Sequence, residues 1–195
     1  MKKGQKRKNK RGKVYIALVH SPVYNKNKEI VTTSITGFDL HDIARSGLTY
    51  GVSGYYVVNP LEAQREFAKR IVNCWGSIES FKFNPTRAEA FRLLKLVPDL
   101  DDALGKIKKE TGRLPKVIAT SAKARDGINF DKLKLKMKKS EDPYLILFGT
   151  GWGLTKEVID RADIVLEPIK GRTNYRHLSV RSAAAIILDR LFAKS

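Results

Sequence analysis

The residues best suited to hold a small ligand lie in the last quarter of the chain. An apolar run, Tyr144 to Phe148, breaks into Gly149-Thr150-Gly151-Trp152-Gly153-Leu154, and glycine lets the backbone approach a ligand closely. A second apolar run, Ile164 to Ile169, leads into the polar loop 170–177. A strand, a glycine loop, a helix, a strand, a loop and a helix in this order are typical of a ligand site at the carboxyl edge of a parallel sheet.

Polar side chains are expected around the same edge. Thr120 and Ser121 follow a predicted strand over residues 115–119 and fit either the rim of the site or a plain turn. Ser179 is predicted to cap the closing helix, whose first N–H groups can bind a carboxylate. Arg181 on that helix can hold a phosphate or a carboxylate. Trp152 is interpreted as a wall or lid of the site, with a place in the core as an equal alternative.

A second candidate for chemistry is a helix predicted from Asp39, as its N-cap, to about Tyr50. His41 and Arg45 are four residues apart and so share one face of that helix. A histidine there can act as a general base, although a surface histidine is the alternative. An arginine stays protonated, which suits it to hold a phosphate or to stabilise a developing alkoxide.

Alternating strand and helix signals predict an α/β fold with a parallel sheet. Short apolar runs predict strands over residues 14–19, 55–58, 115–119, 144–148 and 164–169, with 30–36 extended. Caps and apolar periodicity predict helices over residues 39–50, 59–76, 86–96, 99–112, 155–161 and 179–192. The last of these is so apolar that a sheet or a partner subunit is expected to cover it.

The net charge of +18 over 195 residues points to a polyanionic partner, most simply a nucleic acid. Residues 1–12 read as a disordered basic arm because they hold almost nothing apolar. We see no membrane span and no metal-ligand spacing among the three histidines and the single Cys74. One cysteine and no apparent export signal favour the cytoplasm.

The chain resembles the SPOUT superfamily of S-adenosylmethionine-dependent RNA methyltransferases. The resemblance rests on three segments: Phe148 to Leu154, Leu166 to Ile169 and Leu178 to Ala183. Upstream, Asp39 to Val52 looks like the first motif of the ribose 2′-O-methyltransferase branch, whose arginine falls on Arg45. Three motifs in the right order are a more specific signal than any one alone.

The resemblance implies a single domain over residues 13–195, with helices on both faces of the sheet, a C-terminal trefoil knot at about 116–192, and a homodimer. It also implies that S-adenosylmethionine is bound at the knot. The residues expected to contact this cofactor are Thr120, Ser121, Leu147, Phe148, Gly149, Thr150, Gly151, Gly153, Leu166, Glu167, Pro168, Ile169, Leu178, Val180 and Ala183. The residues expected on the acceptor side are His41, Arg45, Ser179 and Arg181.

The sequence departs from the ribose-methylating branch at several positions. That branch usually has Asn and Gly where this chain has Asp39 and His41, Glu where Gly151 stands, and Asn where Ser179 stands. We therefore expect methylation of RNA, with tRNA and its ribose 2′-oxygen as the first target and guanine N1 as the alternative. A non-catalytic RNA-binding protein stays open. An NAD-dependent oxidoreductase is least favoured, because the glycine spacing is one residue short of the dinucleotide fingerprint.

Overall fold

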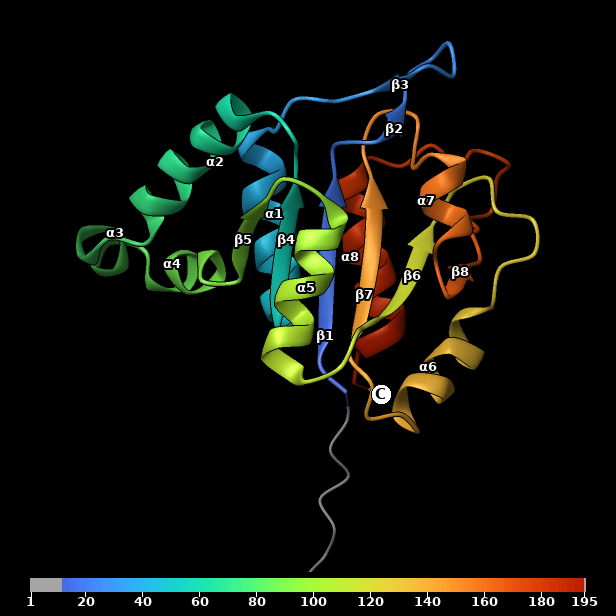
Figure 1. The fold of residues 1–195 in the computed structure, drawn as a ribbon. Helices are drawn as coiled ribbons and strands as arrows, with labels where there is room; N and C mark the ends of the chain where they lie inside the picture. Colours follow the sequence, from blue (N-terminus) through green and yellow to red (C-terminus); the bar gives the residue numbers. More distant parts are fainter. Residues whose placement is uncertain (1–11, 195) are drawn as a thin grey trace, which may run out of the picture.

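The apolar runs of the sequence form the centre of the protein, a six-stranded sheet in which every neighbouring pair is parallel (Figure 1). A computed structural model describes residues 12–194; the predicted basic arm lies outside them except for Gly12. The strands are β1 (Val14–Val19), β2 (Val23–Tyr24), β3 (Ile30–Val31), β4 (Gly54–Val58), β5 (Leu94–Val97), β6 (Lys116–Thr120), β7 (Tyr144–Gly149) and β8 (Ile164–Leu166). The order in the large sheet is β5-β4-β1-β7-β6-β8, while β2 and β3 form a separate antiparallel pair.

Helices cover both faces of the sheet, as expected for a parallel sheet whose strands are buried. They are α1 (Gly37–Thr49), α2 (Glu62–Trp75), α3 (Ile78–Phe83), α4 (Pro85–Phe91), α5 (Leu100–Thr111), α6 (Phe130–Lys138), α7 (Lys156–Asp160) and α8 (Val180–Phe192). Apolar side chains of α1, α4, α6 and α8 pack with one face of β1, and those of α5 and α7 pack with the other. Figure 1 shows α5 and α7 in front of the sheet and α1 and α8 behind it.

The register of the central strands brings the ligand-binding loops together. Val19 at the end of β1 pairs with Gly149 at the end of β7, and Ala119 of β6 pairs with Leu147. Because the strands are parallel, the chain leaves all of them at one edge, where the small β2–β3 hairpin also lies (Figure 1). Sites in such sheets form at this carboxyl edge.

The predicted helix over residues 86–96 was wrong in its second half. The helix α4 ends at Phe91, and Leu94–Val97 forms the edge strand β5 beside β4. Leucine and lysine suit a helix, but β4 offers an unpaired edge, and Tyr55 N donates 2.7 Å to the Leu93 carbonyl. Tertiary hydrogen bonding therefore overrides local propensity here.

Two helix starts also differ from the prediction. Thr36, not Asp39, caps α1, because its hydroxyl accepts from the Asp39 N–H at 3.2 Å while it donates to the Asp39 carboxylate at 2.7 Å. The helix predicted from Asn59 begins at Glu62, since the buried Asn59 instead accepts from Leu61 N and donates to the Thr33 carbonyl.

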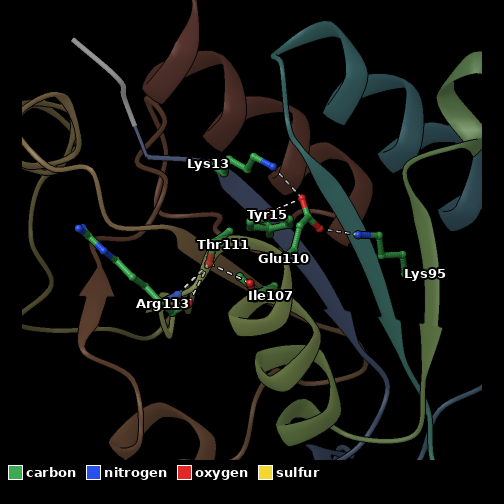
Figure 2. Close-up of polar contacts among 7 residues, drawn as sticks. All are labelled: Lys13, Tyr15, Lys95, Ile107, Glu110, Thr111 and Arg113. Atoms are coloured by element: carbon green, nitrogen blue, oxygen red, sulfur yellow. Dashed lines mark hydrogen bonds and ion pairs between the residues drawn. The ribbon is translucent and has the colours of Figure 1, made fainter. Parts of the chain in front are cut away.

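At the opposite, amino edge of the sheet, one carboxylate ties three elements together (Figure 2). Glu110 of α5 accepts from Tyr15 at 2.8 Å and from Lys13 and Lys95 at 3.0 Å each. Burial alone would raise the pKa of Glu110, but these three hydrogen bonds outweigh it and lower that pKa to about 2. Within the described part of the chain, no helix is long and apolar enough to cross a membrane.

Candidate active site

A cavity of about 520 Å³ opens at the carboxyl edge of the sheet, a volume in the ~300–1,000 Å³ range of small-molecule sites. Segments far apart in the sequence build its wall. The lining residues are Thr33, Ser34, Thr36, Asp39, 120–123, 148–153, 167–169, 176–180, Ala183 and Ile187.

The glycine turn after β7 forms one side of the cavity, and its shape requires glycine. A Cβ on Gly149 would lie 2.6 Å from the Leu154 nitrogen, closer than real contacts allow. Gly151 has a φ of 56°, and a Cβ there would lie 2.9 Å from the Tyr24 carbonyl oxygen. Tyr24 of β2 holds this turn from both sides, because Trp152 N donates to its carbonyl at 2.8 Å and its own N–H donates to the Gly153 carbonyl at 2.9 Å.

Beside the turn runs a chain of hydrogen bonds from a fully buried histidine to the cavity wall. The Thr150 hydroxyl donates to the Val19 carbonyl at 3.1 Å and lies 2.5 Å from the Thr33 hydroxyl. The Thr33 hydroxyl also lies 2.9 Å from Nδ1 of His20 and 3.5 Å from the His20 carbonyl oxygen. Both threonines line the cavity.

A carboxylate also lines the cavity, that of Asp39. One oxygen of Asp39 accepts from Thr36, and the other lies 3.5 Å from Nε of Arg181 on α8. The Asp39 side chain is only 12% exposed. Arg181 also donates to Asp42 at 3.3 Å, so this guanidinium joins the first helix to the last at the edge of the cavity.

The start of α8 contributes backbone donors. The Ser179 hydroxyl accepts from Ser182 N at 3.2 Å, which confirms it as the helix cap. Across the cavity, the Thr120 hydroxyl donates to the Leu147 carbonyl at 2.8 Å. Glu167 accepts from Phe130 N at 3.2 Å and from Lys170 at 3.1 Å, and the bond from Lys170 lowers the pKa of Glu167.

The structure brings together most of the residues that the sequence singled out for the cofactor. All of them line the cavity except Leu147 and Leu166, which are buried in the core beneath its floor. Trp152 lines the wall and is 54% exposed, so its alternative place in the core is wrong. Ser179 lines the cavity, and Arg181 reaches it through Asp39.

His41 and Arg45 do not line the cavity. The imidazole of His41 packs edge-on against Trp75 and Phe91, at 5.5 and 4.6 Å between ring centroids. Burial there lowers the pKa of His41, and the charge of Arg87 adds to this. Arg45 lies exposed on α1. In this chain, the first helix therefore presents Asp39 to the cavity and turns His41 toward α2 and α4.

Sequence reasoning missed part of the wall. The residues not anticipated as lining are Thr33, Ser34, Thr36, Ala122, Lys123, Arg176, His177 and Ile187. A hydroxyl-rich run, Thr32-Thr33-Ser34-Ile35-Thr36, was the available signal for the first three. This run predicts only an extended segment, because nothing local shows that it crosses the end of β1.

The wall suits S-adenosylmethionine. A sulfonium and an ammonium call for acceptors, which the Thr33 and Thr150 hydroxyls supply. A carboxylate calls for donors, which the first turn of the 13-residue helix α8 supplies. Among the described residues, no group of His, Cys, Asp and Glu side chains gathers as a metal site would.

Comparisons with known proteins identify the family of this chain. A family model described as SAM-dependent RNA methyltransferase matches residues 13–193. The chain is 43% identical to an uncharacterized protein of Aquifex aeolicus (strain VF5), over 93% of this chain and 89% of that one. It is 42% identical to a tRNA (guanine-N(1)-)-methyltransferase of Oleidesulfovibrio alaskensis, over 91% of this chain but only 41% of that protein.

A solved structure shows the same fold. The SpoU methyltransferase AviRb from Streptomyces viridochromogenes, in complex with AdoMet, superposes with a TM-score of 0.58 at 15% identity, over 93% of this chain and 57% of that one. Such a low identity supports the fold and leaves the activity to the family match, which spans nearly all of the described residues. This chain belongs to the family of S-adenosylmethionine-dependent RNA methyltransferases.

Proposed function

We propose that this protein transfers the methyl group of S-adenosylmethionine to the ribose 2′-hydroxyl of a tRNA nucleotide. The observation that carries the proposal is the meeting of α1 and α8 at the cavity. Asp39, from the segment that resembles the first motif of ribose methyltransferases, lines the same cavity as the glycine turn and pairs with Arg181 of α8. An acceptor group held by that segment would face a methyl group held by the turn.

Different residues of the chain bind different parts of the cofactor. Phe148, Ile169 and Ala183 offer apolar surface for adenine. The N–H groups of the first turn of α8 bind the amino-acid carboxylate. When bound, the cofactor supplies an electrophilic methyl group, so the protein's main task is to place the acceptor oxygen in line with it.

A ribose hydroxyl must lose its proton as its oxygen bonds to the methyl carbon and the carbon–sulfur bond breaks. We assign the proton acceptor to Asp39. Its carboxylate faces the cavity, is held in one orientation by Thr36 and Arg181, and stands where the ribose branch usually carries Asn. We therefore propose Asp39 as the general base in place of His41, which lies outside the cavity. Arg45 is proposed to hold an RNA phosphate from its exposed place on the same helix.

The experiment is methyl transfer to unmodified bulk tRNA followed by mass spectrometry of the nucleosides. Wild-type protein should yield a 2′-O-methylated nucleoside. Asp39→Asn, which keeps shape but cannot take a proton, should lower the rate by about 10²- to 10⁴-fold and leave the cofactor affinity within a few-fold. Asp42→Asn is the matched control, because Asp42 also pairs with Arg181 but does not line the cavity. Full activity of Asp39→Asn would remove this assignment.

Guanine N1 methylation is the second candidate, favoured by the name of the Oleidesulfovibrio relative. This chain, however, spans about two fifths of that protein's length, and the named activity can reside in the remainder. The same mass spectra decide, because 1-methylguanosine and a ribose-methylated nucleoside give different fragments: the added methyl stays on the base in one and on the sugar in the other.

We further propose that residues 13–195 form one domain whose segment at about 116–192 is knotted. In support, the loop before α6 lies outside β8, where Ile128 N donates to Val165 at 2.8 Å and Glu167 N donates to Ile128 at 2.9 Å. The chain then returns to α8 on the α1 face of the sheet.

The working form is proposed to be a homodimer in the cytoplasm. Phe38 on α1 is 71% exposed, and Ile186 on the neighbouring α8 is only half-buried, so an apolar surface is left beside Arg181. The exposed thiol of Cys74 suits a reducing compartment. Light scattering after size exclusion should give twice the 22.0 kDa of one chain; a monomer at micromolar concentration would contradict the dimer.

A further inference from the structure

Trp152 is a large apolar side chain held at the surface by a rigid backbone. It is 54% exposed, yet its own N–H and the carbonyl of the next residue, Gly153, bond to the two backbone groups of Tyr24. The positive φ of Gly151, at 56°, sets the bend that presents the indole. A mobile loop could bury this ring; a turn held at both ends displays it.

The surroundings of the indole are cationic. The ammonium group of Lys123, which also lines the cavity, lies 5.9 Å from the centroid of the Trp152 ring. A cation above one face of an indole leaves the opposite face free for another flat group.

The loop after β8 also carries exposed aromatic and cationic side chains beside the cavity. Residues 171–179 are all exposed, and they include Arg172 and Arg176. Tyr175 is 72% exposed and packs edge-on against His177, with 5.7 Å between centroids. Arg176 and His177 line the cavity. Exposed aromatic rings among cations are how proteins hold unpaired nucleotides, by stacking on the bases and by pairing with the phosphates.

We propose that Trp152 is the stacking platform for an unpaired nucleobase of the RNA at the cavity mouth, with Lys123 and Arg176 on the flanking phosphates. This inference rests on the proposed function and names its substrate class as a single-stranded or flipped-out segment. A base inside a duplex is stacked on both faces, so it cannot reach an indole in a cavity wall.

The test measures anisotropy of a fluorescently labelled single-stranded RNA 12-mer and of the same sequence in a perfect duplex. Trp152→Ala should bind the single strand about 5- to 150-fold more weakly, the range for loss of one stacked base, and should bind the duplex like wild type. Trp152→Phe should restore most of the affinity, since a phenyl ring also stacks. Phe83→Ala is the matched control, an aromatic residue that is 84% exposed on α3, outside the cavity.

Lys123 is tested by the salt dependence of the same binding. Lys123→Ala should reduce the slope of log K against log salt by about 0.7, the contribution of one phosphate contact on a single strand. Lys132→Ala on α6, also exposed but outside the cavity, should reduce single-strand affinity less. An unchanged slope for Lys123→Ala would overturn its assignment.

Calorimetry with S-adenosylmethionine separates the remaining outcomes. Trp152→Ala should keep the cofactor affinity within about twofold; loss of cofactor binding with intact RNA binding would overturn the proposal and make Trp152 a wall for the cofactor. Equal RNA affinity of Trp152→Ala and wild type would overturn it as well. If the variants show these effects on RNA binding but the wild-type protein transfers no methyl group, the proposed function is refuted and this inference stands.

Discussion

Acid should destabilise this protein in two overlapping pH ranges, and the upper one belongs to His20. The side chain is fully buried at the end of β1, and Nε2 has no hydrogen-bond partner within the described residues. Burial lowers the pKa of His20 from 6.5 to about 4, because a charged imidazole there loses its hydration.

The sign follows from the two pKa values. The unfolded chain takes up a proton near pH 6.5 and the folded protein only near pH 4, so between these values unfolding is coupled to proton uptake. The contribution of His20 is therefore complete above pH 6.5 and is lost as the pH falls to about 4. At ~1.4 kcal/mol per pH unit, the gap corresponds to ~3 kcal/mol in the free energy of unfolding.

Urea denaturation followed by circular dichroism at several pH values between 7 and 4 measures this. His20→Asn places an amide near the position of Nδ1, can still hydrogen-bond to Thr33, and does not titrate. It should remove most of the loss of stability between pH 6.5 and 4. The control is His177→Asn, an exposed histidine, which should leave the curve unchanged. If His20→Asn follows the wild-type curve, the burial argument for this histidine fails.

For three further substitutions, the structure indicates the direction of the effect on stability or on cofactor affinity. Glu110→Gln should lower the free energy of unfolding by about 1 kcal/mol at pH 7, because the ~3 kcal/mol implied by lowering the Glu110 pKa to about 2 is reduced for a side chain that is 33% exposed. This effect should be complete above pH 4.5 and vanish as the pH falls to 2. Equal stability of the variant and the wild type in urea denaturation at pH 7 would contradict it. Gly105→Ala should raise the melting temperature by about 2–4 °C, because a Cβ there meets nothing within 4 Å on an exposed position of α5; a lower melting temperature in calorimetry would contradict it. Gly149→Ala should weaken S-adenosylmethionine by more than ~10-fold in calorimetry, because its Cβ would lie 2.6 Å from the Leu154 nitrogen; wild-type affinity would show that the turn can yield.

The sheet and the glycine turn could be predicted because their signals are local. The runs at residues 14–19 and 144–148 are too short and too apolar for anything but buried strands, and the glycines mark the turn directly. Ser179 was a correct cap for the same reason: its hydroxyl acts on an N–H three residues away. The limits of α4 were not local, because an unpaired edge of β4 decides whether residues 94–97 remain helical.

The polar half of the cavity could not be predicted, because contacts between distant segments assemble it. Thr33 meets Thr150 across 117 residues, and Arg181 meets Asp42 across 139. No periodicity or spacing encodes such pairs. Successive residues of a helix are rotated by about 100°, so Asp39 faces the cavity while His41 faces Trp75. The sequence predicts the angle between these two side chains around the helix axis, but not which of them points into the cavity.

The ion pair between Arg181 and Asp39 explains why one carboxylate can sit in this wall. A carboxylate that is 12% exposed is costly unless a charge or a donor compensates it, and here Thr36, the cap of α1, and Arg181 of α8 do so. Arg181 is shared with Asp42, so the guanidinium still has one partner when Asp39 takes up a proton. The same contact fixes α8 against α1, and the N-terminus of α8 faces the cavity. The group proposed to accept the proton and the helix proposed to hold the cofactor's carboxylate are thus positioned by one arginine.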